Sequence, residues 1–377
     1  MNLCYNYRLY PNRAQASALD TMLWAYRRLY NSALAERKES WEQLQKNVSY
    51  YDQSMKLLKT QRSEDTALAT FNCNAAQQVL RRLDKAFAAF FRRVKSGETP
   101  GYPRFKGRNR FNSVDFTWGN GAGLRGTRLH VQGVGEIKVV WHRAIPDEAT
   151  IKQVTIKRRA GKWFASFVLE LPDVEAPKHP GGEVGIDVGL KSIVTLSTGE
   201  AIAPPQNYRN TEPKLRRANR KASRRIKGSR RQRKAYRDLS ILHEHIGNQR
   251  SDFLHKLSHD LTDRFAVIAV EDLNVKGLAR TRLAKSIHDA GWGILFNLLD
   301  YKAARAGGTV VKVDPRYTSQ DCSGCGTRVP KPLSQRTHSC PECGLVLDRD
   351  HNAALVILTR AGTQPSGANV DTVSCVS

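Results

Sequence analysis

The stretch VGIDVGLKSIVTLSTG, residues 184–199, decides the fold of the second half of the chain. Residues 184–187 and 192–196 are two short apolar runs separated by small residues, a pattern that predicts a pair of strands. Asp187 lies inside the first run, where a charged side chain is costly to bury unless it is paired or bound to a metal. The stretch therefore predicts a sheet that carries a candidate metal ligand.

A second acidic residue ends the next apolar run along the chain. Residues 266–270 are predicted to form a buried strand, and Glu271 follows them directly. In open α/β sheets this end of a strand opens onto the ligand crevice. Residues 287–304 have the pattern of a helix and residues 308–313 that of another buried strand, so the region is predicted to be α/β.

The third acidic residue lies in DRDHNAA, residues 348–354, where a short helix is predicted with Asp350 as its N-cap. Each acid alone has an ordinary structural alternative: a turn Asp, a strand-end Glu and a helix cap. Together, Asp187, Glu271 and Asp350 offer hard oxygen ligands that suit Mg²⁺. Two such ions would activate water and stabilise the leaving 3′ oxygen of a phosphodiester, so we expect these three residues to be catalytic.

Four cysteines form two C-x-x-C pairs with 14 residues between them. They are Cys322, Cys325, Cys340 and Cys343. Four thiolates suit tetrahedral Zn²⁺ and leave no open position, which predicts a structural rather than a catalytic site. A redox-active dithiol is the alternative.

The charge of the chain indicates its class of partner. With 61 Lys and Arg against 35 Asp and Glu, the net charge is +26, which favours a polyanion: nucleic acid first, an anionic membrane second. The membrane alternative has no amphipathic segment to support it. The chain also lacks an apolar run of about 18 residues and a signal-peptide pattern at its start, so we expect a soluble, cytoplasmic protein without a membrane partner.

The positive charge is concentrated in residues 213–237, which contain 13 Lys or Arg and no acid. We expect this segment to bind nucleic-acid backbone, although a solvated charge run is the usual alternative. The candidate contacts are Arg216, Arg217, Arg220, Lys221, Arg224, Arg225, Arg230 and Arg231, with Arg104 and Lys106 from an earlier segment.

The first half of the chain differs from the second in its pattern of apolar residues. Residues 3–10 are predicted to form a strand, and residues 13–93 show helical spacing of apolar side chains, including a Phe-rich stripe that ends at Phe91 and predicts bundle core. Short strand-like runs follow at 113–118, 135–141, 151–157 and 163–171. They predict a small barrel or sandwich that the first strand could join, with the helices inserted between.

The order of these motifs resembles the transposon-encoded TnpB nucleases, compact relatives of the type V CRISPR effectors. GIDVGLKS (185–192), VEDLNVKGLA (270–279), the cysteine pairs and DRDHNAA (348–354) are similar to that family's motifs. So are YRLYP (7–11) and YPRFK (102–106). The resemblance covers about residues 1–360, and the cysteine pairs and DRDHNAA are its most specific parts.

The resemblance implies a multidomain α+β architecture. Its parts would be a wedge β-barrel (1–12 and 97–176), an inserted helical recognition lobe (13–96), a RuvC-like, RNase H-type nuclease domain (181–315 and 346–362) with an inserted zinc ribbon (316–345), and a disordered tail (363–377). The family acid lies two residues before the Asn, here Asn352, so Asp350 rather than Asp348 is implied as the third catalytic residue.

The resemblance also implies a function, that of an RNA-guided DNA endonuclease. Its partners would be a guide RNA and a double-stranded DNA target next to a short flanking motif, and its cofactors structural Zn²⁺ and catalytic Mg²⁺. Two alternatives stay open: a non-cleaving, RNA-guided DNA-binding regulator, and a transposase or resolvase that acts without RNA.

Overall fold

The computed structural model describes residues 2–108, 110–172, 177–332 and 334–362. Its contacts divide the chain into two compact units, residues 1–173 and 174–377, each mixed α and β. Within the described ranges, every helix is too short or too polar to cross a membrane. The tail predicted at 363–377 lies outside the described residues.

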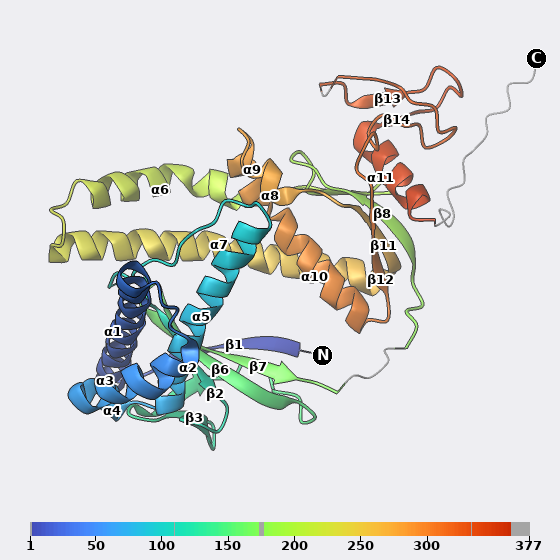
Figure 1. Cartoon of the computed structure of the whole chain (residues 1–377). Coiled ribbons are helices and arrows are strands. Elements are labelled where there is room, and N and C mark those ends of the chain that lie inside the picture. The colour runs from blue at the N-terminus through green and yellow to red at the C-terminus, as the bar shows by residue number, and fades with distance from the viewer. Residues whose placement is uncertain (1, 109, 173–176, 333, 363–377) are drawn as a thin grey trace, which may run out of the picture. The chain divides into compact units, whose positions relative to one another are not determined.

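The first unit is built on an antiparallel, nearly closed, barrel-like sheet (Figure 1). Its strands are β1 (Asn2–Tyr10), β2 (Ser113–Thr117), β3 (Ala122–Arg125), β4 (Arg128–Val131), β5 (Gly135–Val140), β6 (Thr150–Arg159) and β7 (Lys162–Glu170), in the order β2-β6-β7-β1-β5-β4-β3. The first strand does join this sheet, since β1 pairs with both β5 and β7. Sequence analysis missed β3 and β4, which are only four residues long each and lie between glycine-containing turns.

Helices are inserted between β1 and β2. They are α1 (Arg13–Leu44), α2 (Tyr50–Asp52), the π-helix η1 (Gln53–Leu57), α3 (Leu58–Glu64), α4 (Thr66–Thr70) and α5 (Cys73–Lys95). Leu19 and Tyr26 of α1 and Leu83 of α5 are buried, as the helical spacing predicted. The prediction of core was wrong for the end of the Phe stripe, because Phe91 is 54% exposed and its ring packs against Phe87 and Phe90 at the surface.

The second unit contains a five-stranded mixed sheet. Its strands are β8 (Gly182–Asp187), β9 (Val194–Leu196), β10 (Ala201–Ile202), β11 (Phe265–Glu271) and β12 (Thr309–Val313), in the order β10-β9-β8-β11-β12. β11 runs parallel to β8 and β12, whereas β9 is antiparallel to β8. A separate hairpin pairs β13 (Thr337–Ser339) with β14 (Val346–Asp348).

Helices cover both faces of this sheet. The helices of this unit are α6 (Asn207–Ser223), α7 (Arg230–Arg264), α8 (Val275–Leu278), α9 (Ala284–Ala290), α10 (Trp292–Arg305) and α11 (Arg349–Arg360), of which α7 and α10 cover one face of the sheet and α11 the other. Successive strand side chains point to opposite faces. Ile186 and Ile268 therefore join the core formed with α7 and α10, whereas Ala269 and Val313 pack with Ile357 of α11 on the other face.

The helix predicted at residues 287–304 is in fact two helices. Gly291 has a φ of +72° and separates α9 from α10. Only glycine adopts this left-handed backbone without steric cost, so the chain turns there although the apolar spacing continues across it.

The contact between β8 and α11 depends on Gly185. A Cβ atom at this position would lie 2.0 Å from the carbonyl oxygen of Ala354 and 2.8 Å from the backbone nitrogen of Leu358. Ala353 and Ala354 are fully buried, so small residues on both elements allow the helix to approach the strand. Since Gly185 lies two residues before Asp187, the same contact places α11 beside that acid.

We predict that Gly185→Ala destabilises the second unit by about 1–3 kcal/mol, because the added methyl group forces helix and strand apart. The thermal unfolding midpoint, followed by circular dichroism, measures this. Gly293→Ala is the matched control: its Cβ would make only an ordinary 3.8 Å contact with Val275, inside a helix where Ala is favoured. Equal midpoints for Gly185→Ala and the wild type would contradict the prediction.

Candidate active site and cysteine cluster

Two of the predicted acids lie at adjacent strand ends in the second unit. Ile186 of β8 pairs with Val270 of β11, so Asp187 and Glu271, one residue further on, end neighbouring parallel strands. Alternation along the strands points both side chains toward the face that α11 covers. Glu271 is buried and Asp187 is half-buried.

The third acid, Asp350, comes from the first turn of α11. The prediction that it caps this helix was wrong, because Asp348 is the N-cap and accepts hydrogen bonds from the backbone nitrogens of Asp350 (2.9 Å) and His351 (3.2 Å). Asp348 thus satisfies the free N–H groups of the helix end, and the carboxylate of Asp350 remains available for other contacts.

The three acids interact electrostatically. Burial, together with the charges of Glu271 and Asp350, raises the pKa of Asp187 to about 8, against the lowering effect of Arg349. Burial also raises the pKa of Glu271, against the lowering effects of a hydrogen bond from Thr318 and the charge of Arg360. The two other carboxylates thus disfavour the ionisation of Asp187.

Basic and hydroxyl side chains hold two of these carboxylates. The Arg349 guanidinium donates to Oδ1 of Asp350 from Nη2 (2.9 Å) and Nε (3.1 Å), and Arg336 forms an ion pair with Oδ2 at 3.5 Å. Thr318 donates to Oε1 of Glu271. Sequence analysis missed Thr318, Arg336 and Arg349, because one sequence shows no signal that links them to the acids.

The four predicted cysteines form one cluster. Among the described residues, they are the one group of three or more potential ligands whose atoms lie within 4.8 Å of one another, so the cluster can hold a metal such as zinc. Hydrogen bonds from Thr327 lower the pKa of Cys325 to about 6, which favours the thiolate that binds a metal. The three carboxylates do not form so tight a group, because Asp350 is turned toward Arg349 and Arg336.

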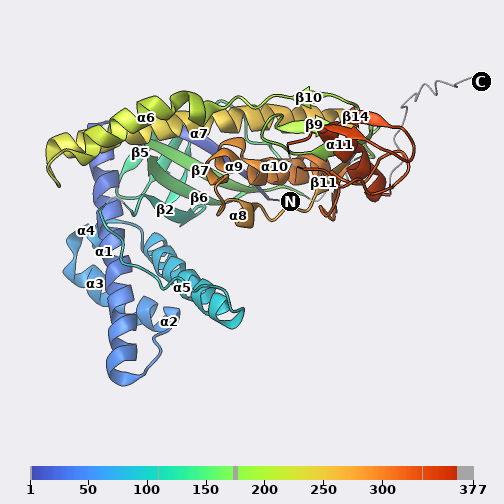
Figure 2. The ribbon, with the colours of Figure 1, turned by 90° about the horizontal axis from the view of Figure 1, so that it is seen from above.

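The basic segment, residues 213–237, spans the ends of two antiparallel helices. Its N-terminal part lies in α6 and its C-terminal part begins α7, and the two helices run side by side in Figures 1 and 2. Leu215, Ala222 and Ala235 form a narrow buried seam between them. All 13 basic side chains are exposed, the eight predicted contacts among them. Within the described residues, only Arg216 of the 13 forms an ion pair, with Glu212.

The other two predicted contacts lie in the first unit. Arg104 is exposed, whereas Lys106 is held in place: its backbone nitrogen donates to Asn31 (2.8 Å) and its ammonium lies 5.5 Å from the centre of the Tyr30 ring. Of the two residues, only Arg104 therefore presents a free basic side chain to solvent.

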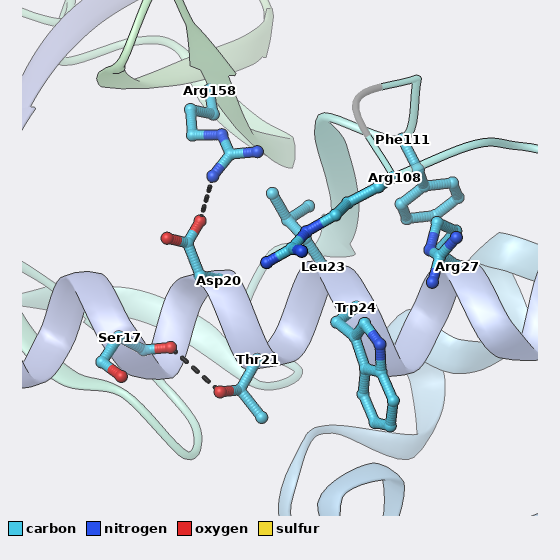
Figure 3. A pocket seen from close by; sticks show the side chains of 9 residues that line it. All are labelled: Ser17, Asp20, Thr21, Leu23, Trp24, Arg27, Arg108, Phe111 and Arg158. Carbon is cyan, nitrogen blue, oxygen red and sulfur yellow. Dashed lines mark hydrogen bonds and ion pairs between the residues drawn. The ribbon is translucent and has the colours of Figure 1, made fainter. Parts of the chain in front are cut away.

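A basic cavity of about 310 Å³ lies near these residues, also within the first unit (Figure 3). Arg27, Arg108 and Arg158 line it together with the half-exposed Trp24. Its one acid, Asp20, forms an ion pair with Arg158. The cavity therefore has excess positive charge beside an aromatic ring, although sequence analysis did not assign it.

Family profiles match three parts of the chain. Residues 166–282 match a profile described as "Probable transposase", residues 292–357 one described as "Cas12f1-like, TNB domain", and residues 1–46 one described as "Helix-turn-helix domain". In this chain residues 1–46 form β1 and the single long helix α1. The other two profiles together include all three acids and all four cysteines.

The chain is also similar to whole proteins. It is 38% identical to "Putative RNA-guided DNA endonuclease" of Streptomyces pristinaespiralis, with 94% of this chain and 88% of that protein covered. It is 30% identical to "Putative RNA-guided DNA endonuclease InsQ" of Escherichia coli (strain K12), with 94% and 91% covered. The Cas12f1 chain of a Cas12f1–sgRNA–target DNA complex shares the fold, with a TM-score of 0.57, 15% identity, and 91% of this chain and 82% of that chain covered. The chain therefore belongs to the TnpB family, among the putative RNA-guided DNA endonucleases.

Proposed function

We propose that this protein is an RNA-guided DNA endonuclease of a transposon-associated family and hydrolyses DNA phosphodiesters at Asp187, Glu271 and Asp350. The observation that carries the proposal is the placement of these three acids on one face of the sheet, at the carboxyl ends of β8 and β11 and in the first turn of α11. The similarity over nearly the whole chain to proteins named as RNA-guided DNA endonucleases supports the reaction class.

We further propose the domain assignment that the family resemblance implied. The second unit would be the RuvC-like nuclease domain (181–315 and 346–362), interrupted by a zinc ribbon (316–345). In the first unit, the sheet would be the wedge barrel (1–12 and 97–176) and the inserted helices the recognition lobe (13–96). The division of contacts at residues 173 and 174 is consistent with this assignment.

The acidic site suits Mg²⁺ by its donor set. All three ligands would be carboxylates, which are hard donors, and their mutual repulsion in a partly buried site is what a divalent cation relieves. Bound Mg²⁺ would supply Lewis-acid stabilisation of phosphoryl oxygens. The Arg349 and Arg336 guanidiniums, now paired with Asp350, supply positive charge at the edge of the site.

The α6–α7 hairpin is the part of the protein that we propose holds nucleic-acid backbone. The 13 cations of residues 213–237, where the two helices meet, are exposed and, with the exception of Arg216, without acidic partners among the described residues. Such side chains are free to replace the counterions of phosphates, which makes binding dependent on salt and independent of sequence. The Cas12f1 chain of similar fold is in a complex with a single guide RNA and target DNA, which supports RNA and DNA as partners here.

The first prediction from the proposed function tests the acids. Asp187→Ala, Glu271→Ala and Asp350→Ala are each expected to reduce guided DNA cleavage to background and to leave guided DNA binding nearly intact, because one lost ligand disables a shared metal site. A plasmid-cleavage assay and a gel-shift assay with the same RNA measure the two activities.

Asp348 supplies the matched control. Asp348→Asn keeps the helix cap and should cleave like the wild type, whereas Asp348→Ala loses a cap worth about 1 kcal/mol but should retain substantial activity. An inactive Asp348→Asn protein beside an active Asp350→Ala protein would reverse our assignment of the third acid.

The second prediction concerns the cysteine cluster. We expect one Zn²⁺ per chain by elemental analysis, held by Cys322, Cys325, Cys340 and Cys343. Cys340→Ala should lose the metal and lower cleavage indirectly, because α11 with Asp350 follows the cluster closely in sequence. Cys73→Ala, an exposed cysteine of the first unit, is the control and should change neither quantity. Full cleavage by metal-free Cys340→Ala would rule out a structural role.

The third prediction concerns the hairpin. The logarithm of the guide RNA binding constant should fall linearly with the logarithm of the salt concentration, with a slope of about −0.7 to −0.9 per phosphate contact. Replacing Arg224, Arg225, Arg230 and Arg231 by Ala should therefore reduce the magnitude of this slope by roughly 3, if all four contact phosphates. Affinity for unrelated RNA should fall about equally, since backbone contacts do not read bases. RNA affinity across a salt series measures both effects.

The control removes four positive charges that already have acidic partners. These are Lys256, Arg264, Lys285 and Lys312, paired with Asp252, Asp260, Glu212 and Asp300. Their replacement by Ala should leave the slope nearly unchanged. If both quadruple variants shift the slope equally, net charge rather than the hairpin governs binding.

A further inference from the structure

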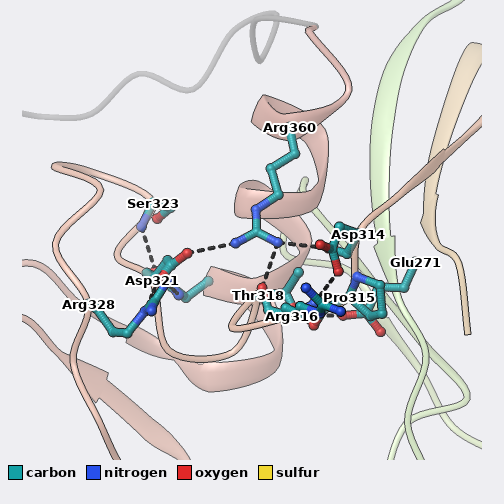
Figure 4. Close-up of polar contacts among 10 residues, drawn as sticks. Glu271, Asp314, Pro315, Arg316, Thr318, Asp321, Ser323, Arg328 and Arg360 are labelled. Carbon is teal, nitrogen blue, oxygen red and sulfur yellow. Dashed lines mark hydrogen bonds and ion pairs between the residues drawn. The ribbon is translucent and has the colours of Figure 1, made fainter.

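The loop of residues 314–321, called here the 314–321 loop, leads from the end of β12 to the first cysteine pair. Glu271 lies opposite Val313 in the sheet, and the backbone nitrogen of Asp272 donates to the Val313 carbonyl at 2.9 Å. The loop therefore begins beside Glu271. Thr318, within the loop, is 2% exposed, and its hydroxyl donates to Oε1 of Glu271, with the Pro315 carbonyl oxygen of its own loop as a second acceptor at 3.1 Å (Figure 4).

Arg360, at the end of α11, holds this loop. Its Nη1 donates to the carbonyl oxygens of Asp314 (2.7 Å) and Arg316 (2.8 Å), and its Nη2 donates to the Asp321 carboxylate at 2.6 Å. Figure 4 shows the guanidinium between the two ends of the loop. Because a guanidinium presents several donors in a rigid plane, this single side chain fixes both ends at once.

Asp321 joins the loop to the start of α11 and to the cysteine cluster. Its backbone carbonyl accepts from Nδ2 of the fully buried Asn352 at 2.8 Å, and Oδ1 of Asn352 accepts from the backbone nitrogen of Ser323 at 3.0 Å. Cys322 lies between these two residues in sequence. Thus the helix that carries Asp350 also holds, from both of its ends, the loop that contacts Glu271.

The backbone of the loop is turned sharply at Tyr317. Its φ of +63° is in the left-handed region, which is uncommon for a residue with a side chain and persists where the surroundings hold it. The turn directs the Tyr317 ring outward, where it stacks with the Arg328 guanidinium at 3.6 Å, and leaves Thr318 buried. The left-handed backbone at Tyr317 thus allows the Thr318 side chain to point inward.

We propose that Thr318 is a positioning residue for Glu271: its hydroxyl fixes the carboxylate through Oε1, so that the other oxygen is held ready for a divalent cation. Arg360 and Asp321 keep the loop in the conformation that this contact requires. The proposal rests on the proposed metal-dependent cleavage. A buried hydroxyl that only satisfies its own hydrogen bond would predict loss of stability, but no change in metal affinity.

The test compares Thr318→Val, which keeps the shape and loses the hydroxyl, with Thr318→Ser, which keeps the hydroxyl. Thr262→Val is the matched control, because Thr262 is equally buried in the same unit and its hydroxyl contacts only backbone carbonyls of its own helix, those of Ser258 (2.8 Å) and His259 (3.2 Å). Glu271→Ala sets the baseline. Two quantities are measured: Mn²⁺ affinity of the full chain, from the electron paramagnetic resonance signal of free Mn²⁺, and the Mg²⁺ concentration for half-maximal cleavage by the RNA-bound protein.

Thr318→Val should weaken Mn²⁺ binding and raise the Mg²⁺ requirement roughly 10-fold, as is typical when the partner of a metal ligand is lost. Thr318→Ser should restore both, and Thr262→Val should match the wild type in both. Wild-type metal affinity in Thr318→Val would overturn the proposal, as would equal losses in Thr318→Val and Thr262→Val or no rescue by Ser. A wild-type protein that binds Mn²⁺ through Glu271 but never cleaves would overturn the proposed nuclease instead, and the metal-affinity comparison would still decide the role of Thr318.

Discussion

The close packing of α11 against β8 is the contact on which the candidate active site depends. Gly185 has no side chain to keep the helix away, and the buried alanines of α11 present an equally small surface. This contact brings Asp350 to the face of the sheet where Asp187 and Glu271 already point. A larger side chain at Gly185 would therefore push α11 away from β8, and Asp350 would move away from Asp187 and Glu271.

Like charges are gathered at two places in this protein, with different physical consequences. In the acidic site, burial and the charges of the neighbouring acids raise the pKa of Asp187, and a bound cation would relieve this repulsion. In the α6–α7 hairpin, the cations remain in solvent, where water and salt screen them. Arg230 and Arg231 lie in the first turn of α7, where the helix dipole disfavours positive charge. Their presence there is unfavourable for the helix and is understandable if phosphates neutralise them.

The sequence predicted the features that depend on local pattern. Alternating and continuous apolar runs located β8, β11 and β12, and the spacing of the cysteines located their cluster. Features that depend on contacts between distant residues were missed or misplaced. Thr318 and Glu271 are 47 residues apart, and threonine and arginine are too common at surfaces for either Thr318 or Arg360 to attract notice. The cap of α11 was assigned to Asp350 because both acids in the motif are good capping residues, and only the backbone geometry selects Asp348.

The helix α11 is synthesised after the basic helices and the sheet. Chains emerge from the ribosome from the N-terminus, and their domains fold as units as they emerge. β8, the α6–α7 hairpin and β11 precede α11 in the chain, so the basic residues are synthesised before Asp350 and Arg360. Under the proposed function, the protein would be able to hold RNA before it is able to cut DNA.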